Sequence, residues 1–236
     1  MTLTLLRENV HQSILDDDVE IVVTELEASP EEVDEARRLL SEDECLRADR
    51  FVFDRDRARY TLARAQLRRM LGKKLETRAE LVEFTYGPHG KPALADRFEY
   101  SDVRFNISHS ENVAIAAICV GREIGIDIEA IHDMSDRDEL AAHCFSKREY
   151  RMYQSLTEDQ KTNAFYECWT RKEAFVKALG DGLQCPLNNF DVTLRPGDPA
   201  DFLRIGDCAV RDRGWELHSF TPRPGFVGAM AIQGST

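Results

Sequence analysis

The chain has 236 residues, a hydrophobic fraction of 42% and a formal net charge of −12. This length allows one large domain or two small ones, and the composition is that of a soluble globular protein. The negative charge argues against general binding to nucleic acid or to anionic membranes. The N-terminus lacks the basic start and apolar stretch of a signal peptide, and the longest apolar run, VAIAAICV, is too short to span a bilayer.

The six cysteines stand singly along the chain, with no CxxC pair; they are residues 45, 119, 144, 168, 185 and 208. Several lie within apolar patterns, where a thiol behaves as a small hydrophobic side chain. We therefore expect free thiols in a reducing cytoplasm, in place of a disulfide framework or a zinc site.

The sequence pattern of the first half of the chain predicts helices followed by short strands. A strand is expected at 20–26, and capping boxes at Ser29 and Ser41 each open a helix. A long helix is expected from Arg57 to about Lys74, ending near Gly72. The extended pieces that follow are LVEFTY (81–86), RFNIS (104–108), VAIAAICV (113–120) and EIGIDIE (123–129).

The second half repeats this order. Ser146 caps one helix, and Thr157 opens a long one that Gly180 and Gly182 stop after residue 178 or 179. The strand-like pieces that follow are 190–194, 208–212, 215–220 and 226–232.

Because both halves read as helices followed by strands, we expect an α+β fold built as a pseudo-two-fold pair of similar lobes. The expected N-terminal lobe is 1–122 and the C-terminal lobe is 123–236, without a convincing residue-level repeat. Clefts between lobes are common ligand sites, so we expect the active site between them.

The run GIDIE (125–129) alternates apolar and acidic residues. In a strand, Ile124, Ile126 and Ile128 share one face, and Asp127 and Glu129 share the other, roughly 6–7 Å apart at their backbones. Two carboxylates at this spacing can bind one cation, or repel each other without one. The alternative is a surface strand whose solvated face happens to be acidic.

The helical segment WTRKEAFVKALGDGL (169–183) places Trp169, Glu173 and Lys177 on one face. A Glu followed four residues later by Lys is also a common surface ion pair. However, an aromatic, an acid and a base on the same face suit the wall of a cleft.

Two short motifs add candidate donors. Lys91 precedes a proline in HGKPAL, which favours an extended or turn conformation. Ser108 and His109 end the apolar strand of FNISHS, where they can donate hydrogen bonds. The alternative for His109 is a turn histidine with a local hydrogen bond.

Residues 47–74 carry ten Lys or Arg against three Asp, within an otherwise acidic chain. This cluster of basic residues indicates a binding site for a small anion, such as a multiply phosphorylated small molecule. Binding to nucleic acid would usually require a broader basic surface. The alternative is a solvated helix face that acids elsewhere balance.

Together these groups supply what Mg²⁺-assisted phosphoryl chemistry needs. Carboxylates hold an octahedral cation, basic side chains bind phosphate charge, and a further carboxylate accepts a proton.

The order GKP, FNISHS, GIDIE, FSKREY and WxRKEAxxK resembles the 4′-phosphopantetheinyl transferases of the surfactin-synthetase-activating type, W/KEA subclass, from about Arg47 to Leu183. The resemblance implies transfer of the 4′-phosphopantetheine of coenzyme A to a serine of an apo acyl or peptidyl carrier protein, with release of 3′,5′-ADP. The WxRKEA form is similar to the subclass that serves polyketide and nonribosomal peptide synthases.

The resemblance also implies the roles of the site residues. Asp127, Glu129 and Glu173 would bind Mg²⁺, or Mn²⁺, which also suits oxygen ligands. Glu173 would be the general base, directly or through a metal-bound water, with Asp127 and Lys177 completing the catalytic set. Coenzyme A would contact Arg47, Arg64, Lys91, Ser108, His109 and Lys177. Trp169 and Lys172 match motif positions that support the site.

The family often has a basic residue shortly before GKP, and here Tyr86-Gly87-Pro88-His89 leaves that contact absent or supplied by His89. Carrier recognition is expected at CFSKREYRMY (144–153), which otherwise packs its apolar residues inward. Its apolar candidates are Phe145, Tyr150 and Met152, and its basic candidates are Lys147, Arg148 and Arg151. We expect a cytoplasmic monomer, with no nucleic acid or membrane partner. The rival interpretations are a Mg²⁺-dependent nucleotide phosphohydrolase and a non-catalytic coenzyme A-binding module.

Overall fold

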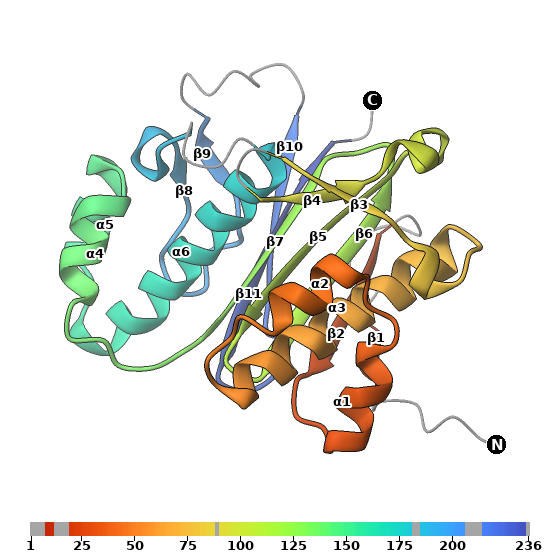
Figure 1. Cartoon of the computed structure of the whole chain (residues 1–236). Coiled ribbons are helices and arrows are strands. Elements are labelled where there is room, and N and C mark those ends of the chain that lie inside the picture. Colours follow the sequence, from red (N-terminus) through yellow and green to blue (C-terminus); the bar gives the residue numbers. More distant parts are fainter. Residues whose placement is uncertain (1–7, 12–18, 88–89, 181–184, 206–213, 235–236) are drawn as a thin grey trace.

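The chain folds into two antiparallel sheets, each covered by one long helix (Figure 1). The structure is a computed structural model, and it describes residues 8–11, 19–87, 90–180, 185–205 and 214–234. Among these residues, no helix is long and apolar enough to cross a membrane. The α+β prediction is confirmed.

The first sheet has four strands in the order β1-β2-β6-β5. Their bounds are Glu8–His11 (β1), Glu20–Glu25 (β2), Val103–Ser110 (β5) and Val113–Val120 (β6). The helices between β2 and β5 in the chain are Pro30–Arg37 (α1), Glu42–Ala48 (α2) and Asp54–Lys74 (α3). A small hairpin joins Phe84–Tyr86 (β3) to Pro92–Leu94 (β4), between 3₁₀ turns at Ala79–Leu81 and Asp96–Ser101.

The second sheet has three strands in the order β10-β11-β7. Their bounds are Ile124–Ala130 (β7), Trp215–Phe220 (β10) and Phe226–Gln233 (β11). The helices of this half are Arg137–Cys144 (α4), Lys147–Gln154 (α5) and Glu158–Leu179 (α6). A 3₁₀ turn at Leu187–Asn189 leads to the short pair Asp191–Val192 (β8) and Phe202–Arg204 (β9).

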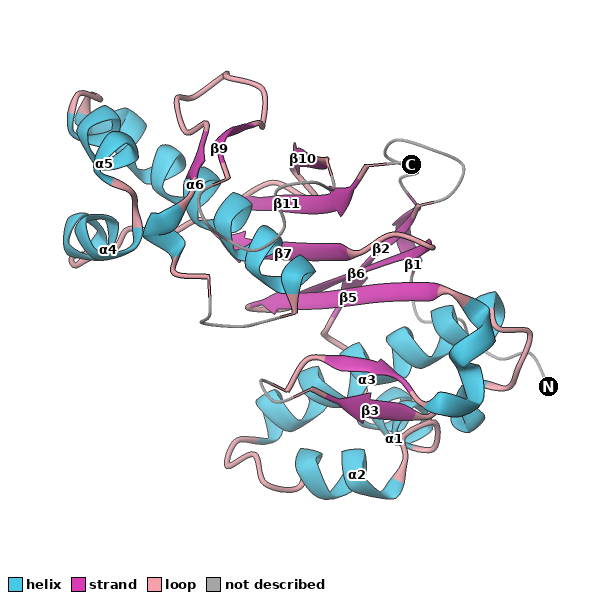
Figure 2. Cartoon of the chain, turned by 90° about the horizontal axis from the view of Figure 1, so that it is seen from above, coloured by secondary structure: helices cyan, strands magenta, loops and turns pink. Residues whose placement is uncertain are grey.

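Strand alternation decides which side chains reach which layer. On β6, Val113 and Ile115 face a core shared with Ile126 of β7 and Met230 of β11, so apolar faces of both sheets pack together. The intervening positions of β6, such as Ala116, pack under α3. From above, β7 and β5 lie side by side, which brings the two sheets together along these strands (Figure 2).

The four predicted capping boxes are present at the starts of α1, α2, α5 and α6. The residues that cap them are Ser29, Ser41, Ser146 and Thr157. Helix α6 ends at Leu179 and is capped by Gly180, whose φ of 73° is the left-handed conformation that glycine adopts without strain. Gly182 and the strand expected at 208–212 lie outside the described residues.

Several element bounds differ from the sequence prediction. Helix α3 begins three residues before Arg57, at Asp54. The segment 81–86 is extended as a strand only from Phe84, because Ala79–Leu81 is a 3₁₀ turn, and 190–194 pairs only at β8. Helix α4 has no side-chain cap at Asp136, so its start carries no capping-box signal.

The cysteines follow the prediction in part. Cys45, Cys119, Cys144 and Cys168 are free thiols, and burial raises the pKa of Cys119 to about 11. Cys185 is disulfide-bonded, so the expectation of free thiols throughout was wrong. Residues far apart in sequence can pair once the fold brings them together, which spacing alone does not reveal.

Candidate active site

The site is built where α6 crosses β7, and Gly125 makes this crossing close. A side chain at Gly125 would put its Cβ 2.1 Å from the carbonyl oxygen of Ala174 and 2.2 Å from the amide nitrogen of Ala178. Only glycine admits the helix backbone this near to a strand. The contact fixes α6 over β7, so that the side chains of Glu173 and Lys177 face those that follow Gly125.

The two faces of β7 differ as the GIDIE pattern predicts. Ile124, Ile126 and Ile128 are buried in the core shared by the two sheets. Asp127 is only 3% exposed and lies on the opposite face, toward α6. Because β7 is paired with β11 and flanked by β5, the alternative of a solvated acidic surface strand is excluded.

Asp127 is held by groups from both halves of the chain. Its Oδ1 accepts a hydrogen bond of 2.9 Å from Ser108 Oγ of β5 and one of 2.6 Å from Lys177 Nζ of α6. Lys177 also donates to Ser108 Oγ, at 2.9 Å. The other carboxylate oxygen, Oδ2, is buried and has no hydrogen-bond partner among the described residues. A buried carboxylate oxygen without a donor is costly unless a ligand satisfies it.

Glu129 and Glu173 are the other two carboxylates of the site. Burial raises the pKa of Glu129, the charge of Asp127 adds to this, and hydrogen bonds from Ser110 and Trp169 oppose it. Burial also raises the pKa of Glu173, and the charges of Asp127 and Glu129 raise it further against the effect of Lys177. Three acids therefore face one region, and Lys177 is the lysine that opposes their charges among the residues that the structure describes.

These residues fit a divalent cation in their chemistry, although the side chains do not enclose one as they stand. Carboxylate oxygens are the ligands that Mg²⁺ prefers, and Asp127 Oδ2 is an oxygen in need of a positive partner. Within the described parts of the chain, however, no three His, Cys, Asp or Glu side chains already form a group that could hold a metal. Lys177 supplies the positive charge beside Asp127 in this arrangement.

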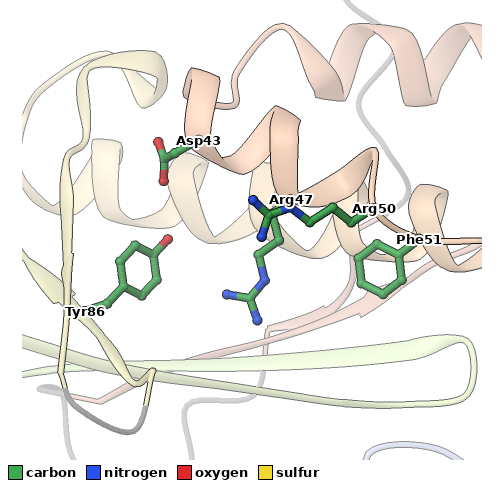
Figure 3. A pocket seen from close by; sticks show the side chains of 5 residues that line it. All are labelled: Asp43, Arg47, Arg50, Phe51 and Tyr86. Carbon is green, nitrogen blue, oxygen red and sulfur yellow. The ribbon is translucent and has the colours of Figure 1, made fainter.

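An arginine-rich cavity leads away from these carboxylates. A cavity of about 330 Å³ is lined by Ser108, His109 and Lys177 together with Arg47 and Arg64. It shares Arg47, Phe51 and Tyr86 with a second cavity of about 600 Å³, which Asp43 and Arg50 complete (Figure 3). The shared residues place the two cavities next to each other.

A buried cluster with excess positive charge lies against the smaller cavity. Glu44 accepts from Arg64 Nε at 2.8 Å and from Arg68 Nε at 2.6 Å, and all three side chains are buried. One carboxylate faces two guanidinium groups, so a positive charge remains uncompensated inside the cluster. Arg64 also donates to Tyr86 Oη, at 3.0 Å, and lines the cavity.

The predicted anion-binding residues therefore lie in two different places. Arg47, Arg64, Ser108 and His109 all line the smaller cavity, and the guanidinium of Arg47 lies 5.7 Å from the centre of the Tyr60 ring. Lys91 lies apart from it: its Nζ donates to the carbonyl oxygen of Ala178 at the end of α6, at 3.2 Å. The expected role of Lys91 in phosphate binding stays a prediction.

The motif residues Trp169 and Lys172 lie beside the site. Trp169 stacks on Phe165, with ring centres 5.9 Å apart. Lys172 is completely buried and pairs with Glu149 of α5 at 2.8 Å. Both side chains are therefore fixed by packing or pairing, and their role in supporting the site stays a prediction.

The segment 144–153 was expected either to recognise the carrier protein or to pack its apolar residues inward, and its residues differ in this respect. Phe145 is 3% exposed and packs inward in the core of the second half, as the alternative expects. The basic side chains Lys147, Arg148 and Arg151 are exposed on α5. Their part in carrier recognition stays a prediction.

Sequence reasoning missed Glu44, Arg50, Tyr86 and Ser110 as site residues. Glu44 was seen only as the fourth residue of a capping box, at helix position N3, and the geometry of this box is indeed present. Ser110 had a usable signal, since it stands two residues after Ser108 in the same strand and so shares its face.

Comparison with known proteins places the whole chain in one class of enzyme. Residues 123–222 match the family described as the 4'-phosphopantetheinyl transferase superfamily, and residues 24–120 match 4'-phosphopantetheinyl transferase, N-terminal. The 4'-phosphopantetheinyl transferase HetI of Nostoc sp. (strain PCC 7120) is 37% identical over 222 residues, covering 94% of this chain and 90% of HetI. The 4'-phosphopantetheinyl transferase Sfp of Bacillus subtilis (strain 168) is 33% identical, covering 70% of this chain and 71% of Sfp.

The chain therefore belongs to the 4′-phosphopantetheinyl transferases, and the resemblance read from its motifs is confirmed. It is an Sfp-like enzyme of this family, and phosphopantetheinyl transfer is its activity.

The raised pKa values of Glu129 and Glu173 predict a pH dependence of stability in the metal-free protein. The folded state keeps these protons to higher pH than the unfolded state, so stability falls as pH rises from about 4.5 through the folded pKa values. The variant Glu173→Gln should flatten this fall, because one of the two groups no longer titrates.

Thermal denaturation of both proteins between pH 4 and 8, in chelator, measures the effect. The melting temperature of Glu173→Gln, relative to that of the unmodified protein, should increase as pH rises. A constant difference across this range would contradict the prediction.

Proposed function

We propose that this protein transfers the 4′-phosphopantetheine of coenzyme A to a serine hydroxyl of an apo acyl or peptidyl carrier protein, in a Mg²⁺-dependent reaction that releases 3′,5′-ADP. The observation that carries the proposal is the placement of Ser108 and Lys177, which line the smaller arginine-containing cavity and also hydrogen-bond Asp127 of β7. A phosphorylated nucleotide in these cavities would bring its diphosphate next to Lys177 and Asp127.

The charge of the cavity walls supports a nucleotide with several phosphates. Arg47 and Arg50 line the larger cavity, and the buried cluster of Glu44, Arg64 and Arg68 contributes an excess positive charge behind the smaller one. Guanidinium groups match phosphate geometry well and stay charged at any physiological pH. The net charge of the chain is −12, so the positive charge of these cavity walls is opposite in sign to that of the whole protein. A local positive charge of this kind favours a bound anion.

In the proposed step, the serine oxygen of the carrier forms a bond to the phosphorus that bears pantetheine. The bond from this phosphorus to the oxygen of the second phosphate breaks, and the electron pair leaves with 3′,5′-ADP. Glu173 accepts the serine proton, for which burial and its acidic neighbours already raise its proton affinity. Lys177 lies where negative charge on the departing phosphate would be balanced.

Asp127, Glu129 and Glu173 would hold the divalent cation. When bound, Mg²⁺ neutralises charge on the diphosphate and helps to orient it. The unpartnered Oδ2 of Asp127 supports this assignment. The same proposal divides the chain into lobes at 122/123, with these acids in the second lobe, and treats it as a monomer.

Intact-mass spectrometry of an apo carrier protein tests the proposal directly. After incubation with this protein, coenzyme A and Mg²⁺, the carrier should gain the mass of one phosphopantetheine, and 3′,5′-ADP should appear in equal amount. The gain should vanish in excess chelator and with a carrier whose acceptor serine is replaced by alanine.

The rival functions give different results in this assay. Release of 3′,5′-ADP without any carrier would indicate a nucleotide phosphohydrolase. Coenzyme A binding without mass gain on several unrelated carriers would indicate a binding module and overturn the proposal.

A further inference from the structure

Strand β7 has two edges, and they are hydrogen-bonded in different ways. One edge pairs with the backbone of β11; the other lies beside β5, whose side chains accept hydrogen bonds from backbone amides of β7 (Figure 2). The amide of Ile126 donates to Asn106 Oδ1 at 2.8 Å, and the amide of Ala130 donates to Ser110 Oγ at 3.0 Å. Asn106 and Ser110 lie at alternate positions of β5, together with Ser108, and therefore share one face.

Ser110 also contacts a carboxylate of the site. Its Oγ donates to Glu129 Oε2 at 2.9 Å. A hydroxyl has one proton and two acceptor lone pairs. The amide of Ala130 donates to Ser110 Oγ, so the backbone of the strand that carries Glu129 also holds the serine hydroxyl in place. The hydroxyl proton is then directed to the carboxylate of Glu129. Ser108 is arranged in the same way: it donates to Asp127 Oδ1 and accepts a hydrogen bond from Lys177 Nζ, which takes the place of the backbone amide.

We propose that Ser110 is a positioning residue of Glu129, and that it orients this carboxylate for the divalent cation. The inference rests on the proposed function, because it takes Glu129 as a ligand of that cation. The hydroxyl that donates to Glu129 is itself fixed by the backbone amide of Ala130, so it restricts the orientation of the Glu129 carboxylate. Groups that orient metal ligands in this way are worth about 10- to 100-fold in metal affinity.

Asn106 allows this role to be separated from a purely structural one. Like Ser110, Asn106 accepts a hydrogen bond from a backbone amide of β7 and so connects the two sheets. Among the described residues, its side chain has no hydrogen bond to a carboxylate. If the bond to the backbone were all that mattered, the loss of either side chain would have the same consequences.

The test compares Ser110→Ala with Ser110→Thr, in the presence of coenzyme A. Binding of Mn²⁺ is followed by electron paramagnetic resonance of the free ion, and the Mg²⁺ dependence of carrier modification is measured in parallel. Ser110→Ala should weaken Mn²⁺ binding about 10-fold and raise the half-saturating Mg²⁺ concentration by a similar factor. Ser110→Thr keeps the hydroxyl on a residue that suits a strand, and should stay within about two-fold of the unmodified protein.

Asn106→Ala is the matched control, expected to lower the melting temperature without changing the half-saturating Mg²⁺ concentration. Ser110→Cys is the second variant, since it keeps the volume of the side chain but replaces a strong donor by a weak one; it should follow Ser110→Ala. Unchanged Mn²⁺ binding in both Ser110→Ala and Ser110→Cys would overturn the inference while leaving the proposed function intact. An unmodified protein that binds no Mn²⁺ and modifies no carrier would overturn both.

Discussion

Replacing Glu173 with glutamine should reduce transfer to a carrier protein by about 10²- to 10⁴-fold, the range typical of a lost general base. Glutamine keeps the length and hydrogen-bonding capacity of the side chain but cannot accept the serine proton. Binding of coenzyme A should largely persist, because the arginines that line its proposed cavities come from other elements. Single-turnover transfer measured by intact mass, with coenzyme A affinity from calorimetry, separates the two effects.

Glu167→Gln is the matched control for this variant. Glu167 stands on the same helix, is also partly buried with a raised pKa, and pairs with Arg171 at 3.3 Å, away from the three acids of the site. It should retain transfer close to that of the unmodified protein. Transfer by Glu173→Gln at a near-normal rate would show that a different group accepts the proton.

The local signals in the sequence were reliable where a single element decides the outcome. Each capping box depends on four consecutive residues, and all four open helices in the structure. The alternation of GIDIE depends on strand geometry alone, so the placement of Ile126 in the core and Asp127 opposite to it was predictable. The pairing of Trp169, Glu173 and Lys177 on one helical face followed from periodicity in the same way.

What the sequence did not reveal depends on contacts between distant elements. Arg64 could be assigned to an anion site from its basic segment, but its pairing with Glu44 requires α2 to lie against α3. Lys91 could be assigned to phosphate from its motif, but its contact with Ala178 joins residues 87 positions apart. The importance of Gly125 becomes visible only when α6 is placed on β7.

The buried pair formed by Lys172 and Glu149 accounts for the largest stability effect that we expect. Lys172 Nζ donates to the carbonyl oxygens of Leu187 and Phe190, at 2.6 and 2.7 Å, and pairs with Glu149 Oε2 at 2.8 Å. Glu149 in turn accepts from the amide of Val192, at 2.7 Å. One lysine thus fastens α6 to α5 and to the segment that leads into β8.

Lys172→Met should lower the free energy of unfolding by about 3–5 kcal/mol, the cost of leaving a buried charge without its partner. Burial already raises the pKa of Glu149, and Lys172 is the main opposing influence, so the variant should raise that pKa further. Because a protonated Glu149 no longer carries an unpaired charge, the loss of stability should shrink as pH falls toward 5. Denaturant unfolding at pH 5 and pH 7.5 measures both effects.

Two further variants decide whether the pair itself is responsible. Lys172→Met combined with Glu149→Gln removes both charges and should recover a substantial part of the lost stability. Lys161→Met removes a lysine from the same helix that bridges Asp138 and Glu158, both exposed, and should change stability little. If the double variant were as unstable as Lys172→Met alone, the defect would come from the freed carbonyl groups of Leu187 and Phe190, and the role of Lys172 would be to bind that segment rather than to neutralise Glu149.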